Sequence, residues 1–189
     1  GPATGLPTRT EQADMLFMLH ASQGEFPRFL LAPGTVEESF HVGWQAFNLA
    51  EKYQTPALVM SDHYLAMAYR TVEKDSLDFD KVSIDRGDLL TDEELDALQE
   101  PYLRYRVTDS GVSPRALPGH PNAVWVSSSN DHFENGAITE EPETRIAQVD
   151  KRQRKQVHTL PGQPLGLGQT ATAAGPPRGR GPGHHRSLP

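Results

Sequence analysis

The chain has no cysteine among its 189 residues. This absence excludes disulfide bonds, thiolate zinc sites and cysteine-ligated iron–sulfur clusters within the chain itself. The sequence also has no apolar run close to the roughly 18 residues that indicate a membrane span. Its first residues lack the charged-then-apolar pattern of a secretory signal. We therefore expect a cytoplasmic protein without a membrane partner.

Acidic side chains are missing from the end of the sequence. Residues 1–150 carry all 25 acids and 11 of the 18 bases, whereas residues 151–189 carry the other seven bases and no acid. Residues 156–189 also hold seven glycines and six prolines and no aromatic residue. Such a segment buries too little apolar area to offset its backbone entropy. We expect an acidic body followed by a disordered, basic, Gly/Pro-rich tail.

Two interpretations of this tail follow from its composition. Its bases could contact nucleic acid through charge, but they are few and lack interleaved aromatic residues, which argues against a nucleic-acid partner. An out-of-frame reading of a GC-rich message would give the same bias toward Gly, Pro, Arg and His. Because the chain starts without Met in what resembles the middle of a loop, we also expect a fragment of a longer protein.

The first half of the chain alternates between helix and strand patterns. Helical spacing of apolar residues predicts helices over residues 10–21 and 35–52. Short apolar runs predict strands at residues 28–32 and 56–62, the second covered on both faces. Helix, strand, helix and strand with short links predict a parallel sheet. The expected fold class is α/β, as part of a doubly wound, mainly parallel sheet.

The second half is less periodic. We expect a short helix over residues 91–98, a turn-rich stretch over 105–121, a strand at 123–129 and an exposed turn at 131–136. Residues 139–155 have acids near their start and bases toward their end, as the helix dipole favours, and predict a final helix. Capping-box spacing recurs at three predicted helix starts: Thr8 and Glu11, Thr35 and Glu38, and Thr91 and Glu94.

The opening stretch, GPATGLPT, is the candidate binding loop. In α/β sheets, ligands bind beside the loops that join the carboxyl ends of strands to helices. Gly1 and Gly5 would let a ligand approach the backbone closely, and a helix N-terminus favours an anion. The alternative is a tight turn followed by a helix cap, in which Thr8 has only a structural role.

Four stretches of the sequence resemble, in register, the alpha subunit of 2-oxoacid:ferredoxin oxidoreductases, especially the 2-oxoglutarate type. They are residues 1–15, 26–66, 105–119 and 144–155. The resemblance implies that residues 1–155 form part of a pyrimidine-binding domain of a thiamine diphosphate enzyme. It also implies a beta subunit that supplies the diphosphate and magnesium site and the iron–sulfur cluster.

The resemblance gives the opening loop a role. It implies that the loop faces the substrate end of the thiamine site, where Thr8 helps to hold the 2-oxoacid and Gly1 and Gly5 allow close approach. The implied reaction is oxidative decarboxylation, with electrons passed to ferredoxin and the acyl group to coenzyme A. In the family, the activating glutamate and a substrate-binding arginine precede this loop. We therefore assign no catalytic residue and no metal ligand here, and expect the isolated chain to be inactive.

Three function classes stay open at this point. The chain could be one component of an enzyme that works only with its partner subunit. It could be an interaction module that keeps a subunit interface without catalysis. It could also be a truncated product with no stable role. Mixing the chain with a beta subunit and measuring ferredoxin reduction would separate the first class from the other two.

Overall fold

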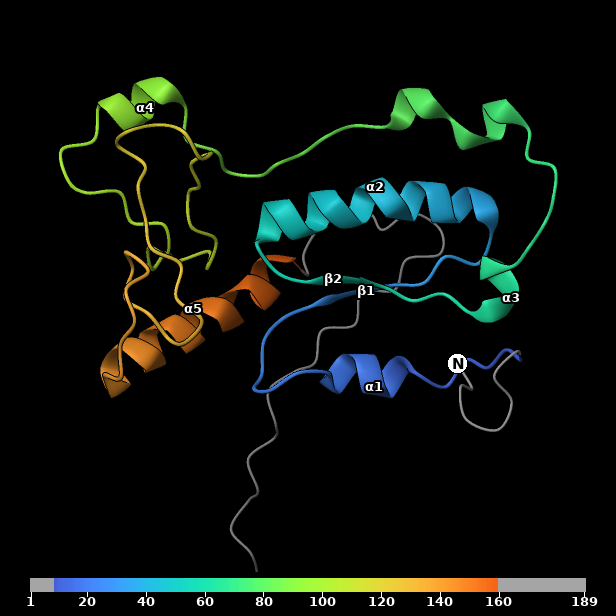
Figure 1. Ribbon diagram of the computed structural model, residues 1–189, viewed down its shortest axis with the longest axis horizontal. Helices are drawn as coiled ribbons and strands as arrows, with labels where there is room; N and C mark the ends of the chain where they lie inside the picture. The colour runs from blue at the N-terminus through green and yellow to red at the C-terminus, as the bar shows by residue number, and fades with distance from the viewer. Residues whose placement is uncertain (1–8, 160–189) are drawn as a thin grey trace, which may run out of the picture.

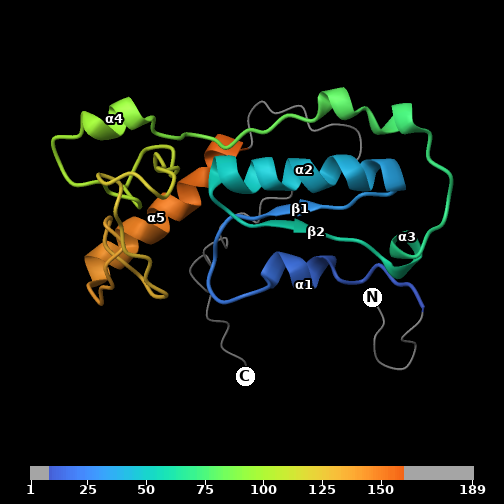
Figure 2. The same ribbon diagram turned by 45° about the horizontal axis from the view of Figure 1, so that its top comes forward.

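The computed structural model describes residues 9–159 of the chain, with side chains described through residue 155. It begins with α1 (Met15–His20), β1 (Phe29–Leu31), α2 (Val36–Tyr53) and β2 (Ala57–Val59). The two strands pair in parallel, with Phe29 opposite Ala57 and Leu31 opposite Val59. Helices α1 and α2 lie on opposite faces of this pair (Figures 1 and 2). The predicted α/β class with parallel pairing is confirmed.

Helix α2 begins at a capping threonine and ends at a residue with a left-handed backbone. The Thr35 hydroxyl accepts a hydrogen bond from the Glu38 backbone N–H at 3.1 Å. The Glu38 carboxylate accepts from the Gly34 N–H at 2.7 Å, so the reciprocal bond goes to the residue before Thr35. The helix ends at Gln54, which has a left-handed backbone with φ of 50°. The cap predicted from the sequence therefore forms, with one partner shifted.

A cluster of buried side chains surrounds α4 (Asp92–Asp96). The Thr91 hydroxyl and the Glu94 carboxylate form the complete predicted capping box at its start. Leu95 is fully buried in a core that also contains Tyr102, Ala116 and Ala123. Between β2 and α4 lie three short elements, α3 (His63–Ala66), η1 (Lys74–Leu77) and η2 (Phe79–Lys81).

The final helix, α5 (Pro142–Thr159), confirms the helix predicted over residues 139–155. It extends four residues beyond the expected boundary between body and tail, so residues 156–159 are helical. The rest of the predicted tail, residues 160–189, lies outside the described residues. Among the described residues, no helix is both long enough and apolar enough to cross a lipid bilayer.

Two predicted elements differ from the structure. The helix expected over residues 10–21 is only the six-residue α1, so Glu11 precedes the helix instead of lying in its first turn. None of the α1 residues is fully buried, and an isolated helix of this length is only marginally stable. The strand expected at residues 123–129 is irregular. Its backbone pairs weakly, with a 3.4 Å bond from Val126 N–H to the Asn135 carbonyl.

Two predictions of burial also need correction. Strand β2 is not covered on both faces, since Val59 is 47% exposed. Within the described residues the sheet has two strands, so β2 lacks a neighbour on its other side. The turn at residues 131–136 is formed, and an antiparallel bridge between His132 and Ile138 closes it. Most of this turn is half-buried instead of exposed, because it packs beside α5.

Candidate functional site

The carboxyl ends of the two strands lie at one edge of the sheet. There β1 leads into α2 and β2 leads into α3, and the described N-terminal segment, residues 9–14, runs past the same edge (Figure 1). A hydrogen bond from the Met60 N–H to the Leu31 carbonyl, at 2.7 Å, continues the pairing to the end of the strands. This edge is where α/β sheets bind ligands. We call it the carboxyl edge.

Asp62 joins the N-terminal segment to the carboxyl edge. Its Oδ1 accepts a hydrogen bond from the Leu65 backbone N–H at 2.8 Å, which caps α3. Its Oδ2 accepts from the Gln12 side-chain amide, also at 2.8 Å. The Gln12 bond, followed by the Leu65 bond, holds the pKa of Asp62 below its usual value. Asp62 is therefore an ionised acceptor that fastens residue 12 beside the end of β2.

The N-terminus of α2 does not fit a diphosphate group. Glu37 and Glu38 lie in its first turn, and Glu38 and Thr35 already partner backbone N–H groups there. The Glu37 carboxylate forms an ion pair with Arg70 at 2.6 Å. Two carboxylates at a helix N-terminus offset the positive potential that would attract an anion. The described residues also contain no group of three His, Asp or Glu side chains placed to hold a metal ion.

The predicted site residues Gly1, Gly5 and Thr8 lie outside the described residues. Sequence reasoning did not single out Gln12 or Asp62 as partners. The position of Asp62 directly after an apolar run could have indicated a helix cap. No local signal could have found Gln12, because its partner is 50 residues away along the chain.

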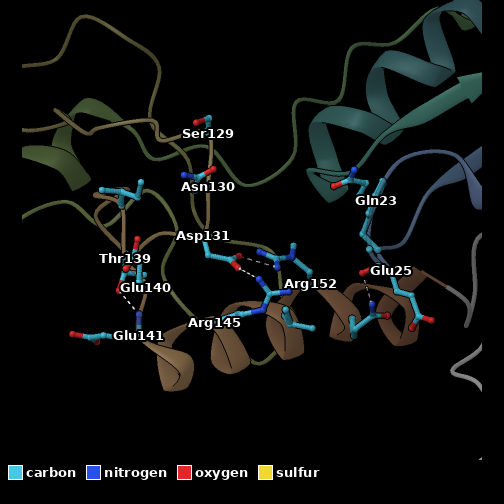
Figure 3. Close-up of a pocket in the computed structure, with 15 residues that line it drawn as sticks. Gln23, Glu25, Ser129, Asn130, Asp131, Thr139, Glu140, Glu141, Arg145 and Arg152 are labelled. Carbon is cyan, nitrogen blue, oxygen red and sulfur yellow. Dashed lines mark hydrogen bonds and ion pairs between the residues drawn. The ribbon is translucent and has the colours of Figure 1, made fainter.

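A groove of about 1160 Å³ lies away from this edge, between the segment before β1, the loop at residues 129–141, and α5 (Figure 3). Asp131 forms ion pairs there with Arg145 at 2.8 Å and with Arg152 at 3.4 Å. The Gln153 amide donates to the Glu25 carbonyl at 2.8 Å. These groups satisfy one another across the groove, so we assign them to holding the loop and the segment before β1 on α5.

Two buried lysines fasten α5 to the rest of the molecule. The Lys151 ammonium donates to the Tyr105 carbonyl at 2.7 Å, and the Lys155 ammonium donates to the Gln54 carbonyl at 2.6 Å. Burial, with the charges of Lys155 and Arg104, lowers the pKa of Lys151 to about 7. Burial and the Arg104 charge lower the pKa of Lys155 to about 8. Neither ammonium is close to the carboxyl edge, and we assign both to structure.

Residues 1–151 match the family model described as pyruvate flavodoxin/ferredoxin oxidoreductase, thiamine diphosphate-binding. The chain belongs to this family. The match covers most of the chain, and it includes both strands, α2, and the carboxyl edge. The resemblance on which the sequence-based expectations depend is therefore confirmed.

Individual relatives support the assignment of the chain to this family. The chain is 39% identical over 155 residues to the alpha subunit of 2-oxoacid:ferredoxin oxidoreductase 1 from Sulfurisphaera tokodaii, which covers 82% of this chain and 24% of that protein. It is 41% identical over 155 residues to the alpha subunit of 2-oxoacid:ferredoxin oxidoreductase 2 from Aeropyrum pernix, covering 82% and 23%. A 66-residue stretch is 44% identical to 2-oxoglutarate oxidoreductase subunit KorA from Mycobacterium tuberculosis, covering 35% and 10%.

A solved structure has the same fold. It is the 2-oxoglutarate:ferredoxin oxidoreductase from Magnetococcus marinus, with 2-oxoglutarate, coenzyme A and succinyl-CoA bound. The TM-score is 0.67 at 34% sequence identity, and the match covers 85% of this chain and 27% of that one. The chain thus spans about a quarter of the length of the relatives that it matches over most of its own length.

Proposed function

We propose that this chain is part of the alpha subunit of a 2-oxoacid:ferredoxin oxidoreductase, and that it forms one wall of the thiamine diphosphate site. The proposed reaction is oxidative decarboxylation of a 2-oxoacid, with the acyl group passed to coenzyme A and electrons to ferredoxin. The continuous match of residues 1–151 to the thiamine diphosphate-binding family carries this proposal. Relatives named for 2-oxoglutarate support that acid as the substrate.

We assign the contact with substrate to the opening loop. The Thr8 hydroxyl would donate a hydrogen bond to the 2-oxoacid, and Gly1 and Gly5 would let it approach the backbone. The described residues support this placement because Gln12, four residues after Thr8, is hydrogen-bonded at the carboxyl edge. In such enzymes the cofactor carries the difficult chemistry and the protein orients the reactants. No described residue is assigned a part in the chemical step.

The diphosphate and magnesium site and the iron–sulfur cluster are assigned to other parts of the enzyme. The N-terminus of α2 is occupied by its own carboxylates, and the chain has no cysteine to ligate an iron–sulfur cluster. We therefore propose that a beta subunit provides the diphosphate and magnesium site and the cluster. This division is consistent with the inactivity that we expect of the isolated chain.

A chimeric enzyme tests the proposal. In the alpha subunit of the Sulfurisphaera tokodaii relative, the segment aligned with residues 1–155 is replaced by this chain's residues, and the chimera is assembled with its partner subunit. We expect reduction of ferredoxin that depends on 2-oxoglutarate, coenzyme A and added thiamine diphosphate. The unmodified relative is the positive control, and the isolated 189-residue chain should show no turnover.

The chimera also separates the alternatives. If it folds and assembles with its partner but reduces no ferredoxin with any 2-oxoacid, the proposed enzyme function is wrong and an interaction module remains. If it neither folds nor assembles while the unmodified relative does, the result favours a truncated product. Turnover with pyruvate in place of 2-oxoglutarate would contradict only the proposed substrate.

A further inference from the structure

The buried face of α5 is made of polar side chains. Gln148, Lys151 and Lys155 follow one another at steps of three and four residues, so they lie on one side of the helix. Their exposed fractions are 2%, 5% and 7%, whereas the apolar side chain of Ile146 is 59% exposed. This helix therefore turns charged groups inward and leaves a large apolar group outside.

The inward side chains bind backbone carbonyls. Gln148 and Lys151 donate to the Tyr105 carbonyl at 3.4 and 2.7 Å, and the Tyr105 ring lies 6.0 Å from the Lys151 ammonium. Lys155 donates to the Gln54 carbonyl at 2.6 Å. Because a carbonyl carries no net charge, neither bond neutralises the charge of its buried ammonium.

Gln54 connects three parts of the chain at this place. It directly follows α2 and has a left-handed backbone. Its side-chain oxygen accepts from Arg104 at 3.2 Å, and its side-chain amide donates to the Ser113 carbonyl at 2.5 Å. Its own carbonyl holds Lys155. The end of α2, residues 104–113 and α5 thus meet at one residue, and the Lys155 bond is the one that α5 supplies.

The surroundings of the two amines oppose a positive charge. The charged groups that act on Lys151 are the cations of Lys155, Arg104 and Arg152 and the carboxylate of Glu134. Those that act on Lys155 are Arg104 and Arg152. Burial is the larger cause in both cases, and the like charges add to it, so the pKa of Lys151 falls to about 7 and that of Lys155 to about 8.

We propose that α5 is a pH-sensitive clamp. With both amines neutral, it holds residues 104–113 against the turn between α2 and β2, and it loosens from this seat when the amines take up protons. A neutral amine can still donate to its carbonyl, whereas an ammonium must also leave water without a carboxylate partner. The clamp does not depend on the proposed function.

The direction of the pH dependence follows from proton counting. In an undocked α5 both amines are in water and have ordinary lysine pKa values. The undocked state then binds more protons than the docked state between about pH 7 and pH 10, so docking weakens as the pH falls through this range and changes little below it. From pH 6.5 to pH 8.5 the ratio of docked to undocked molecules should rise about 100-fold.

Distances between two spin labels test the clamp in the 189-residue chain. The chain has no cysteine, so Ile146→Cys on the exposed side of α5 and Gly43→Cys in open space on α2 provide the only attachment points. Pulsed EPR should give one distance at pH 8.5. At pH 6.5 a second, broader population should appear, while the helical circular dichroism is retained.

Variants of the lysines identify the groups responsible. With Lys151→Met and Lys155→Met together, the labelled chain should give one distance at both pH values, because methionine has a similar length and no charge. Lys81→Met is the matched control, since the Lys81 side chain is 74% exposed. It should leave the second population at pH 6.5 unchanged.

Three outcomes would overturn the clamp. One is a single distance at both pH values in the chain with its lysines intact. Another is a second population at pH 6.5 that persists when both lysines are methionine, since other groups would then control α5. The third is loss of the helical circular dichroism at pH 6.5, which would mean that the whole chain unfolds and α5 does not loosen by itself.

A second measurement follows the protons directly. In the chain labelled with ¹³C at lysine Cε, two NMR signals should titrate between about pH 7 and pH 8. Lys151→Met should remove one of them and Lys155→Met the other. If every lysine signal titrates only above pH 9, the buried amines keep their protons throughout the range of the EPR experiment, and the clamp is wrong.

Discussion

The two buried lysines of α5 make the stability of this chain depend on pH. Lys151 and Lys155 are 5% and 7% exposed, and each donates to a backbone carbonyl instead of pairing with a carboxylate. Burial lowers the pKa of Lys151 to about 7 and that of Lys155 to about 8, from 10.5. In the unfolded chain both side chains return to solvent and to ordinary lysine behaviour.

The direction of the effect follows from proton counting. Between pH 7 and pH 10.5 the unfolded chain binds more protons at Lys151 than the folded chain does, so the free energy of unfolding rises with pH. Between pH 7 and pH 9 this group alone should add about 2 kcal/mol, and Lys155 should add about 1 kcal/mol. The buried ammonium therefore weakens the fold at pH 7 relative to pH 9.

Urea unfolding of the 189-residue chain at pH 7 and pH 9 measures this rise. Lys151→Met keeps a side chain of similar length without the charge, and it should make the rise about 2 kcal/mol smaller. Lys81→Met is the matched control, because the Lys81 side chain is 74% exposed and Asp78 raises its pKa. If the Lys151→Met chain gains as much stability from pH 7 to pH 9 as the unchanged chain, Lys151 does not titrate in this range and the reasoning is wrong.

Four further predictions concern stability and activity. Gly111→Ala should lower the free energy of unfolding by at least about 1–2 kcal/mol, because φ is +77° and the new Cβ would collide with a carbonyl oxygen of α5. Gly43→Ala, in open space on α2, should instead raise the free energy of unfolding by about 0.5–1 kcal/mol. Urea unfolding measures both changes. Thr91→Ala should cost about 1 kcal/mol through loss of the α4 cap, and Thr91→Ser should restore it; equal stability of all three would contradict the capping role. In the chimera, Thr8→Val should lower kcat/KM roughly tenfold, as loss of about 1.4 kcal/mol of transition-state binding requires; unchanged kinetics on every 2-oxoacid would refute its substrate contact. Deleting residues 160–189 should leave the melting temperature nearly unchanged, and a fall of many degrees would mean that this segment packs.

Elements with local causes were predictable from the sequence. The caps at Thr35 and Thr91 require only residues within four positions of each other, and both form. The apolar runs at residues 28–32 and 56–62 are separated by one helix, and this arrangement favours parallel pairing because the helix returns the chain to the same side. The observed pairing of β1 with β2 follows from this pattern.

Elements that depend on distant partners were not predictable. Residues 123–129 have the expected alternation, with Ala123 buried and Val124 77% exposed, but a strand also needs a neighbour to complete its ladder. Likewise, the bases toward the end of residues 139–155 suited the helix dipole, and this pattern gave no partner for them. In the structure, Lys151 and Lys155 are buried against carbonyls 46 and 101 residues away in sequence. No local pattern identifies a carbonyl as the partner of a lysine.

Several apolar side chains around the two-stranded sheet are exposed. Leu16 and Phe17 of α1 are 70% and 71% exposed, and Val59 at the end of β2 is 47% exposed. Exposed apolar side chains of this size are favoured where another segment covers them, because burial removes apolar area from water. The matched segment is about a quarter of the length of two relatives, which therefore contain further chain. In a protein of that length, additional segments would cover these side chains and remove them from water.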